Sequence, residues 1–118
     1  MRLRPGQHLR RQSDIRSVRQ NGRRVDCSAF TLWWMPKPAD VACRRACFVA
    51  SIQSVGKAVL RNRAKRRLRE VFRRHQELLP ASVDMMFVAR SRVNERSLGD
   101  LDRAFMDACG RMQRAPSP

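Results

Sequence analysis

The sequence predicts an α+β fold, a single-domain sandwich in which a mixed sheet of about four strands carries helices on one face. Three observations support this class. The chain has 118 residues, of which 42% are hydrophobic, and both values suit one domain, 1–118, with one core. Short β-branched and aromatic segments alternate with longer segments whose apolar residues recur at helical spacing. A strand, a long helix and a further strand follow one another, an order typical of a βαβ crossover.

The first third of the chain predicts a basic arm, a short helix and a strand. Residues 1–12 are rich in arginine, and we expect them to form a loosely held arm. Ser13 and Asp14 are residue types that cap helices, and they predict a helix that runs through Gln20. Residues 28–35 are aromatic and β-branched, which favours a strand.

The middle of the chain predicts the βαβ crossover. Residues 45–51 predict a buried strand, and the short link from 28–35 predicts that these two strands pair antiparallel. A long helix is expected over 57–78, with apolar residues on one side and Pro80 at its end. An apolar strand over 83–89 completes the crossover.

A second amphipathic helix is expected near the C-terminus. Ser97 and Asp100 have the spacing of a capping box, and apolar residues continue at helical spacing as far as Gly110. Phe105 is the bulkiest of these residues, and we assign it to the core. We expect residues 111–118 to form a frayed tail.

The charge of the chain indicates its class of partner. Lys and Arg number 26 against 10 Asp and Glu, which gives a formal net charge of +16. Such a surplus attracts polyanions, so nucleic acid is the first partner class and an anionic membrane surface the second. No apolar run is long enough to span a bilayer, and no apolar signal segment follows the basic N-terminus. We therefore expect a cytoplasmic protein.

The predicted helix over 57–78 has two faces. Leu60 and Leu68 lie on the apolar side, whereas Asn62 and Arg66 point away from it. A rigid helix presents its guanidinium groups to phosphates as a fixed array, and Asn62 adds an uncharged group that can contact a base or a 2′-hydroxyl. Like charges one turn apart cost roughly 0.2–0.5 kcal/mol each, so a purely structural helix would alternate its signs. The nine basic residues of this segment are Lys57, Arg61, Arg63, Lys65, Arg66, Arg67, Arg69, Arg73 and Arg74.

Alternation along the strand over 28–35 separates two faces. Phe30 and Trp34 share one face, and Thr31 and Trp33 share the other. One face has to pack against helices. The other is suited to stack unpaired bases on its aromatic side chains.

Composition and spacing leave several function classes open. A basic helix suits an RNA-processing subunit, a structural RNA-binding protein such as a ribosomal protein, or a DNA-binding module that inserts the helix into a major groove. A role at a membrane surface fits least, because the core needs the apolar stripe of the helix. No paired carboxylates, Cys/His pair or Ser/His/Asp set points to a catalytic side chain. The four cysteines lack Cys-x-x-Cys spacing, so we expect no metal site.

Residues 55–73 carry a specific motif. From Gly56 to Glu70 the sequence has the expected residue at every defined position of the pattern Gly-x-Ala-Val-x-Arg-Asn-Arg-x-Lys-Arg-x-x-Arg-Glu. This motif resembles the signature of the bacterial ribonuclease P protein subunit. In element order and length the resemblance extends over roughly residues 8–112.

The resemblance implies an accessory RNA-binding subunit of a ribonucleoprotein endoribonuclease, with one protein bound to one RNA, that removes the 5′ leader from precursor tRNA. It also implies that the RNA subunit holds the Mg²⁺ ions and performs the hydrolysis. No catalytic side chain, metal ligand or small-molecule cofactor is then expected in the protein. The resemblance assigns Phe30, Trp33 and Lys57 to leader binding. It assigns a larger set to the RNA subunit: Arg61, Asn62, Arg63, Lys65, Arg66, Arg69 and Arg73.

Two departures from the family pattern concern the leader-binding side. The family usually has a Ser-Lys-Lys-like stretch before the glycine, whereas Ile52, Gln53 and Ser54 carry no positive charge. The first helix of the family usually has a phenylalanine where this chain has Ile15. Any difference from the family is therefore expected in leader binding rather than in binding to the RNA subunit.

Overall fold

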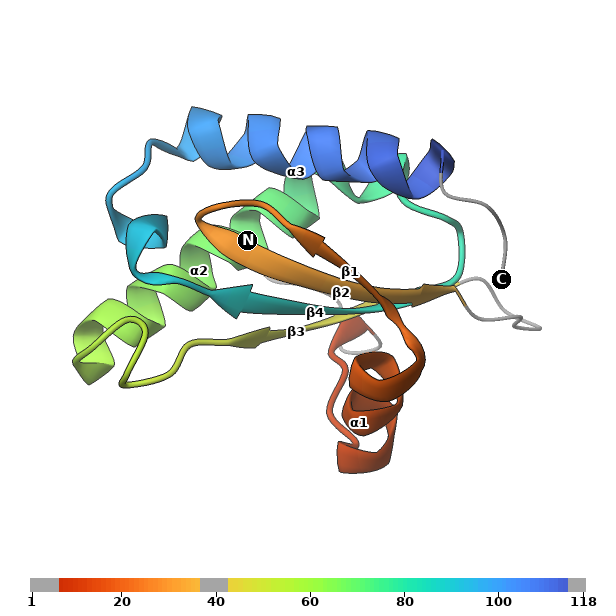
Figure 1. Ribbon diagram of the computed structural model, residues 1–118, viewed down its shortest axis with the longest axis horizontal. Coiled ribbons are helices and arrows are strands. Elements are labelled where there is room, and N and C mark those ends of the chain that lie inside the picture. The colour runs from red at the N-terminus through yellow and green to blue at the C-terminus, as the bar shows by residue number, and fades with distance from the viewer. Residues whose placement is uncertain (1–6, 37–42, 115–118) are drawn as a thin grey trace.

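The computed structural model of the protein describes residues 7–36 and 43–114. These residues form one four-stranded sheet and three α-helices (Figure 1). The elements follow the order α1 (Gln12–Asn21), β1 (Arg23–Asp26), β2 (Phe30–Pro36), β3 (Arg44–Val49), α2 (Ala58–His75), η2 (Gln76–Leu78), β4 (Val83–Ala89), η3 (Ser91–Asn94) and α3 (Leu98–Arg114). The predicted α+β class with a mixed sheet is confirmed. Along the chain, the long helix α2 connects the parallel strands β3 and β4, as the βαβ prediction requires.

The strands lie in the order β1-β2-β4-β3. Strand β2 pairs antiparallel with β4, with Phe30 opposite Ala89, and β3 pairs parallel with β4. The predicted antiparallel pairing of β2 with β3 is therefore wrong, because β4 lies between them. Six of the seven residues of β4 are buried, and a strand that is apolar on both faces belongs in the centre of a sheet.

Strand β1 was not expected from the sequence. It has four residues, alternately half-buried and exposed, and it pairs antiparallel with β2 from Arg23 opposite Trp34 to Asp26 opposite Thr31. Ser28 takes a positive φ of 68° in the turn between the two strands, and its backbone N–H donates to the Asp26 carboxylate at 3.0 Å. A strand this short and polar has no apolar pattern of its own.

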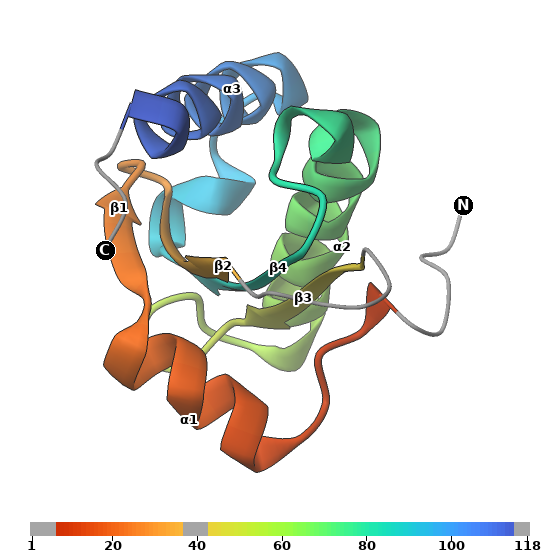
Figure 2. The same cartoon turned by 90° about the vertical axis from the view of Figure 1, so that its right-hand side faces the viewer.

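Helices cover both faces of the sheet (Figure 2). α2 and α3 lie over one face, as predicted, and enclose the larger core. α1 lies over the other face, where Leu9, Val18 and Met86 form a smaller buried cluster. The prediction of helices on one face only is therefore wrong for α1. The apolar side of α1 is narrow, and a short amphipathic helix does not indicate which face of a sheet it will cover.

Phe87 of β4 lies at the centre of the larger core. It is fully buried, and its ring centroid lies 5.0 Å from that of Phe48, 5.6 Å from Phe105, 5.9 Å from Phe30 and 6.1 Å from Phe72. These four rings come from β2, β3, α2 and α3, so with Phe87 of β4 one aromatic cluster joins five elements. The core assignment of Phe105 is confirmed.

The arm predicted over 1–12 is partly held in place. The Leu9 backbone N–H donates to the carbonyl of Ala46 in β3 at 2.9 Å, and the Leu9 side chain is buried. This contact covers part of the open edge of β3; residues 1–6 of the arm lie outside the described residues. The predicted cap at Ser13 does not form, because α1 begins at Gln12 after Arg11, which makes no side-chain capping bond.

The C-terminal helix begins as predicted and runs further than expected. The Ser97 hydroxyl accepts a hydrogen bond from the backbone N–H of Asp100 at 3.1 Å, which confirms the cap. The helix does not end at Gly110 but continues to Arg114. Met112 explains this, because its side chain is buried against the core and offsets the low helix propensity of the glycine. Residues 115–118 of the predicted tail lie outside the described part of the chain.

Gly22 allows the end of α1 to approach β2 closely. A Cβ atom at this position would lie 2.3 Å from the carbonyl oxygen of Val18 and 2.8 Å from that of Trp34. Both neighbours are backbone atoms, so no side-chain rotation would relieve the overlap. Glycine is therefore required where the chain passes from α1 to β1, and it brings the α1 arginines next to the sheet.

Candidate nucleic-acid interface

Helix α2 separates an apolar face from a basic one, as its sequence predicts. Ala64, Leu68, Val71 and Phe72 are buried against the sheet and α3. Leu60 was also assigned to the apolar stripe, but 39% of its surface is exposed because it lies in the first turn, beyond the edge of the core. The basic residues of the helix remain at or near the surface.

Four of the predicted RNA-contacting residues line a shallow hollow on the outer face of α2, which we call the α2 hollow. Asn62 and Arg66 are exposed, whereas Lys65 and Arg69 are half-buried. Val59 completes the lining. Within residues 7–36 and 43–114, none of these three cations forms an ion pair. The hollow therefore combines unneutralised positive charge with an amide and an apolar wall.

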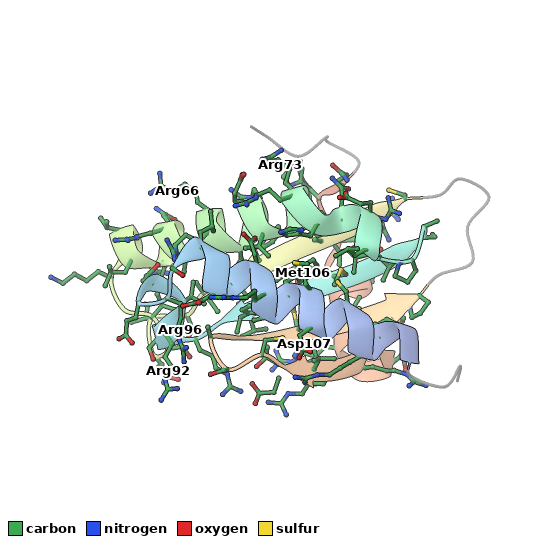
Figure 3. All side chains as sticks on the ribbon, turned by 90° about the horizontal axis from the view of Figure 1, so that it is seen from above. Arg66, Arg73, Arg92, Arg96, Met106 and Asp107 are labelled. Carbon is green, nitrogen blue, oxygen red and sulfur yellow. The ribbon has the colours of Figure 1, made fainter. Side chains whose placement is uncertain are left out.

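Contacts with β3 orient one of these cations. The guanidinium carbon of Arg69 lies 5.4 Å from the ring centroid of Phe48, in a cation–π arrangement. Arg66 projects from α2 on the side away from α3 (Figure 3). The two groups are therefore presented from a fixed helix, and little ordering is required when phosphates bind.

Three predicted contacts do not line the α2 hollow. Arg61 and Arg63 lie nearby on the same helix, half-buried and exposed respectively. Arg73 instead donates to both carboxylate oxygens of Glu70, one turn earlier, and this bond holds the pKa of Glu70 below its ordinary value. Arg73 is thus paired with Glu70 within the protein, and the i, i+3 spacing of the two residues makes this pair possible.

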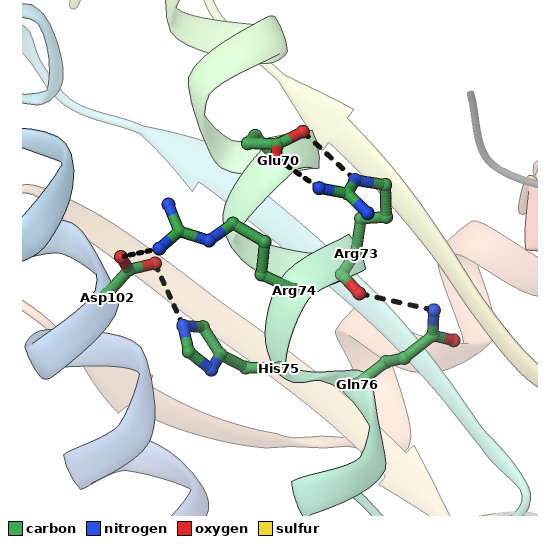
Figure 4. A network of polar contacts seen from close by, with 6 residues as sticks. All are labelled: Glu70, Arg73, Arg74, His75, Gln76 and Asp102. Carbon is green, nitrogen blue, oxygen red and sulfur yellow. Dashed lines mark hydrogen bonds and ion pairs between the residues drawn. The ribbon is translucent and has the colours of Figure 1, made fainter. Parts of the chain in front are cut away.

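The last turn of α2 is further neutralised by α3 (Figure 4). The Asp102 carboxylate lies 3.2 Å from Nη2 of Arg74 and 3.0 Å from Nε2 of His75. Together with the bond from Arg73 to Glu70, these contacts compensate the charges at the C-terminal end of the helix. The unpaired positive charge of α2 is consequently concentrated in its first three turns.

A second hollow lies on the opposite face of the sheet, between α1 and the strands, and we call it the α1 cleft. Arginines from α1, β1 and the end of β4 lie around Trp33 of β2, whose ring centroid is 5.9 Å from the guanidinium carbon of Arg24. Such a combination of cations and an aromatic ring can hold a phosphate backbone and stack a base. The cleft is lined by Arg19, Arg24, Thr31, Trp33, Ser54, Val88, Ala89, Arg90 and Ser91.

Of the three residues predicted to bind a leader, only Trp33 lines this cleft. Phe30 is fully buried on the other face of the sheet, so its assignment to leader binding is corrected to a core role. Alternation separated the two faces of β2 correctly, but it does not show which face the larger core occupies. Lys57 is exposed immediately before α2 and does not line the cleft.

Three arginines of the cleft were not expected from the sequence. Arg19 lies on α1, Arg24 on β1 and Arg90 after β4, so only the folded chain brings them together. The segment in which the chain departs from the family pattern also reaches this site, since Ser54 lines the cleft. Ile15, the other departure, packs against the cluster beneath α1.

The described residues also bear on metal binding and on the reactivity of the cysteines. In the described ranges, no three His, Cys, Asp or Glu side chains are grouped so as to hold a metal ion. Burial raises the pKa of Cys47 to about 11 and those of Cys27 and Cys109 to about 12. These thiols are therefore protonated at neutral pH and are poor nucleophiles. No helix in the described part of the chain has the length and hydrophobicity needed to cross a membrane.

Comparison with known proteins decides the family. A family model described as Ribonuclease P matches residues 3–113. This chain belongs to the ribonuclease P protein family. A relative from Desulfovibrio desulfuricans named ribonuclease P protein component is 37% identical over 90 residues, which cover 76% of this chain and 68% of the relative. One from Chloroflexus aurantiacus is 41% identical over 92 residues, covering 75% and 64%.

Solved ribonuclease P proteins share the fold. The Staphylococcus aureus protein superposes with a TM-score of 0.73 at 20% identity, over 91% of this chain and 94% of that protein. The Thermotoga maritima protein also gives 0.73, at 22% identity, over 88% and 96%. Membership of this family places the chain in a ribonucleoprotein endoribonuclease of tRNA processing, with ribonuclease P RNA and a tRNA substrate as partners.

Proposed function

We propose that this chain binds the catalytic RNA of ribonuclease P through the α2 hollow and the 5′ leader of precursor tRNA through the α1 cleft. It thereby assists removal of the leader to give mature tRNA 5′ ends. The proposal rests on the separation of two basic surfaces, one on the outside of α2 and one beside α1, because these two helices cover opposite faces of one sheet. One protein can then contact two RNA molecules at once.

The α2 hollow suits a folded RNA. Its cations lie on a rigid helix at fixed spacing, which matches a backbone whose phosphates are also held at fixed spacing. Asn62 can donate to and accept from a base edge or a 2′-hydroxyl, which distinguishes RNA from DNA. Arg61 and Arg63 extend the positive surface toward the N-terminal end of the helix.

The α1 cleft suits a single strand. Trp33 offers an aromatic surface for an unpaired base, while Arg19, Arg24 and Arg90 supply charge for the flanking phosphates. Stacking depends little on base identity, so such a cleft would accept leaders of varied sequence. Lys57, which is exposed before α2, is proposed to contact the leader beyond the cleft.

Hydrolysis is assigned to the RNA subunit, which would hold the Mg²⁺ ions. The protein then acts by neutralising phosphates and positioning the substrate, and both effects lower the Mg²⁺ concentration that the complex requires. One protein is proposed to bind one RNA in the cytoplasm, without a small-molecule cofactor.

Reconstitution tests the function. Adding this chain to its cognate ribonuclease P RNA at low Mg²⁺ is expected to raise cleavage of precursor tRNA at the 5′ end of the mature sequence. The protein without RNA is expected to leave the substrate intact. A structural RNA-binding protein would bind RNA without stimulating cleavage, so binding with no gain in rate contradicts the proposal.

Replacement of Trp33 tests the α1 cleft. In the reconstituted complex, Trp33→Leu is expected to weaken binding of precursor tRNA by about 1–3 kcal/mol, because a stacked base loses its aromatic partner. Trp33→Phe should retain most of the affinity. Binding of mature tRNA, which lacks the leader, should be the same for all three proteins. Equal losses for mature and precursor tRNA would instead indicate that Trp33 acts only through the stability of the fold.

A further inference from the structure

The segment over 91–96, which joins β4 to α3, lies between the two RNA-binding surfaces. At its start, Ser91 and the preceding Arg90 line the α1 cleft. Nε of Arg90 donates to the Thr31 hydroxyl of β2 at 3.2 Å, which attaches this end of the segment to the sheet.

The same segment is attached to α2 by two side chains. Nε of Arg67 donates to the carbonyl oxygen of Val93 at 3.2 Å, and Nη2 of Arg67 donates to the carbonyl oxygen of Arg96. Nδ2 of Asn94 donates to the carbonyl oxygen of Leu60 at 3.0 Å. The guanidinium fork of Arg67 thus holds two backbone positions at once, which the single ammonium of a lysine reproduces poorly.

Arg67 differs from the other cations of α2 in what it contacts. It lines neither hollow, and its guanidinium is turned toward the 91–96 segment. Its pKa is lowered by desolvation and then by the neighbouring Arg63. The exposed Arg92 and Arg96 lie across the start of α3 from Arg66 (Figure 3), so the segment occupies a different side of the molecule from the α2 hollow.

We propose that Arg67 and Asn94 are positioning residues, whose bonds to the 91–96 segment fix the α1 cleft relative to the α2 hollow. This inference rests on the proposed function. An RNA subunit bound to α2 and a leader bound in the cleft act together only if the two surfaces keep a defined separation and orientation. Arg67 donates to the Val93 carbonyl, and the Val93 backbone N–H donates to the carbonyl of Arg90 at 3.0 Å. Because Arg90 lines the cleft, these bonds supply a contiguous connection from α2 to it.

The test uses the full chain reconstituted with its RNA subunit. Two quantities are measured for each variant: its affinity for the RNA subunit over a range of salt concentrations, and the ratio of affinities for precursor tRNA and mature tRNA. Arg67→Lys keeps the charge and removes the fork, and Asn94→Ala removes the other bond without changing charge. Arg103→Lys on the exposed side of α3 is the matched control.

Both Arg67→Lys and Asn94→Ala are expected to lower the ratio of precursor to mature tRNA affinity by roughly five- to tenfold. Affinity for the RNA subunit and its salt dependence should stay within about twofold, which also shows that the variants are folded. A ratio that is unchanged in both variants overturns the proposal, because the buried Val93 then suffices to hold the segment. A loss of RNA-subunit affinity in Arg67→Gln that Arg67→Lys restores also overturns it, since Arg67 would then be a direct phosphate contact.

These outcomes are distinct from failure of the proposed function. If the unaltered chain binds the RNA subunit but shows no preference for precursor over mature tRNA, leader binding itself is wrong. The coupling between the two surfaces is then refuted with it. If the unaltered chain shows the preference and the variants keep it, only the positioning role fails.

Discussion

Reversing the charge of both Lys65 and Arg66 to glutamate is expected to weaken binding to the ribonuclease P RNA by roughly 100-fold at physiological salt. Both side chains line the α2 hollow, and neither is neutralised by a described carboxylate. Each lost phosphate contact removes about 0.7–0.9 from the slope of log affinity against log salt, so the double variant should lose about 1.4–1.8. Titration of labelled RNA at several salt concentrations measures both quantities.

A second double variant separates the hollow from the net charge. Arg103 and Arg111 are exposed on α3 and pair with Asp100 and Asp107 on the same helix. Changing both arginines to glutamate alters the net charge by the same amount, at a cost in helix stability of roughly 0.5 kcal/mol for each like-charge pair. We expect only a small loss of RNA affinity in this variant. Equal losses in the two double variants would show that total charge, rather than the geometry of α2, determines binding.

The basic helix could be predicted because local periodicity determines what it exposes. At 100° per residue, Leu68 and Phe72 fall on one side and Asn62 and Arg66 on the other, and the structure keeps this division. The same local reasoning would have identified Arg73 as paired, since Glu70 lies one turn before it. The resemblance to a family motif did not separate paired from unpaired cations.

The α1 cleft could not be predicted, because it depends on strand order. β1 is too short and polar to be recognised alone, and β4 enters between β2 and β3 only because both of its faces are apolar. Arg24 and Arg90 reach the same site through these two strands. Phe30 was misassigned for a related reason: alternation defines two faces of a strand, and long-range packing decides which one is buried.

Arg45→Ala is expected to lower the free energy of unfolding by about 3–5 kcal/mol, because it leaves a buried carboxylate without its main partner. Asp84 of β4 has a side chain that is only 1% exposed, and it accepts two hydrogen bonds from Arg45 of β3, at 2.8 Å each. These bonds raise the pKa of Arg45 above its ordinary value, so its guanidinium stays charged. Urea denaturation with an unchanged m-value would measure the loss.

The double variant Arg45→Met with Asp84→Leu distinguishes the stability of the pair from its role in positioning. Replacement of a buried ion pair by apolar residues is often neutral or stabilising, so most of the lost stability should return. The contact of Arg45 with Asp14 of α1, at 3.6 Å, does not return. Because α1 forms one wall of the α1 cleft, this folded variant should bind precursor tRNA more weakly than the unaltered chain while its binding to mature tRNA stays the same. Full leader affinity in the double variant would mean that Gly22 and the cluster beneath α1 hold the helix in place without the ion pair.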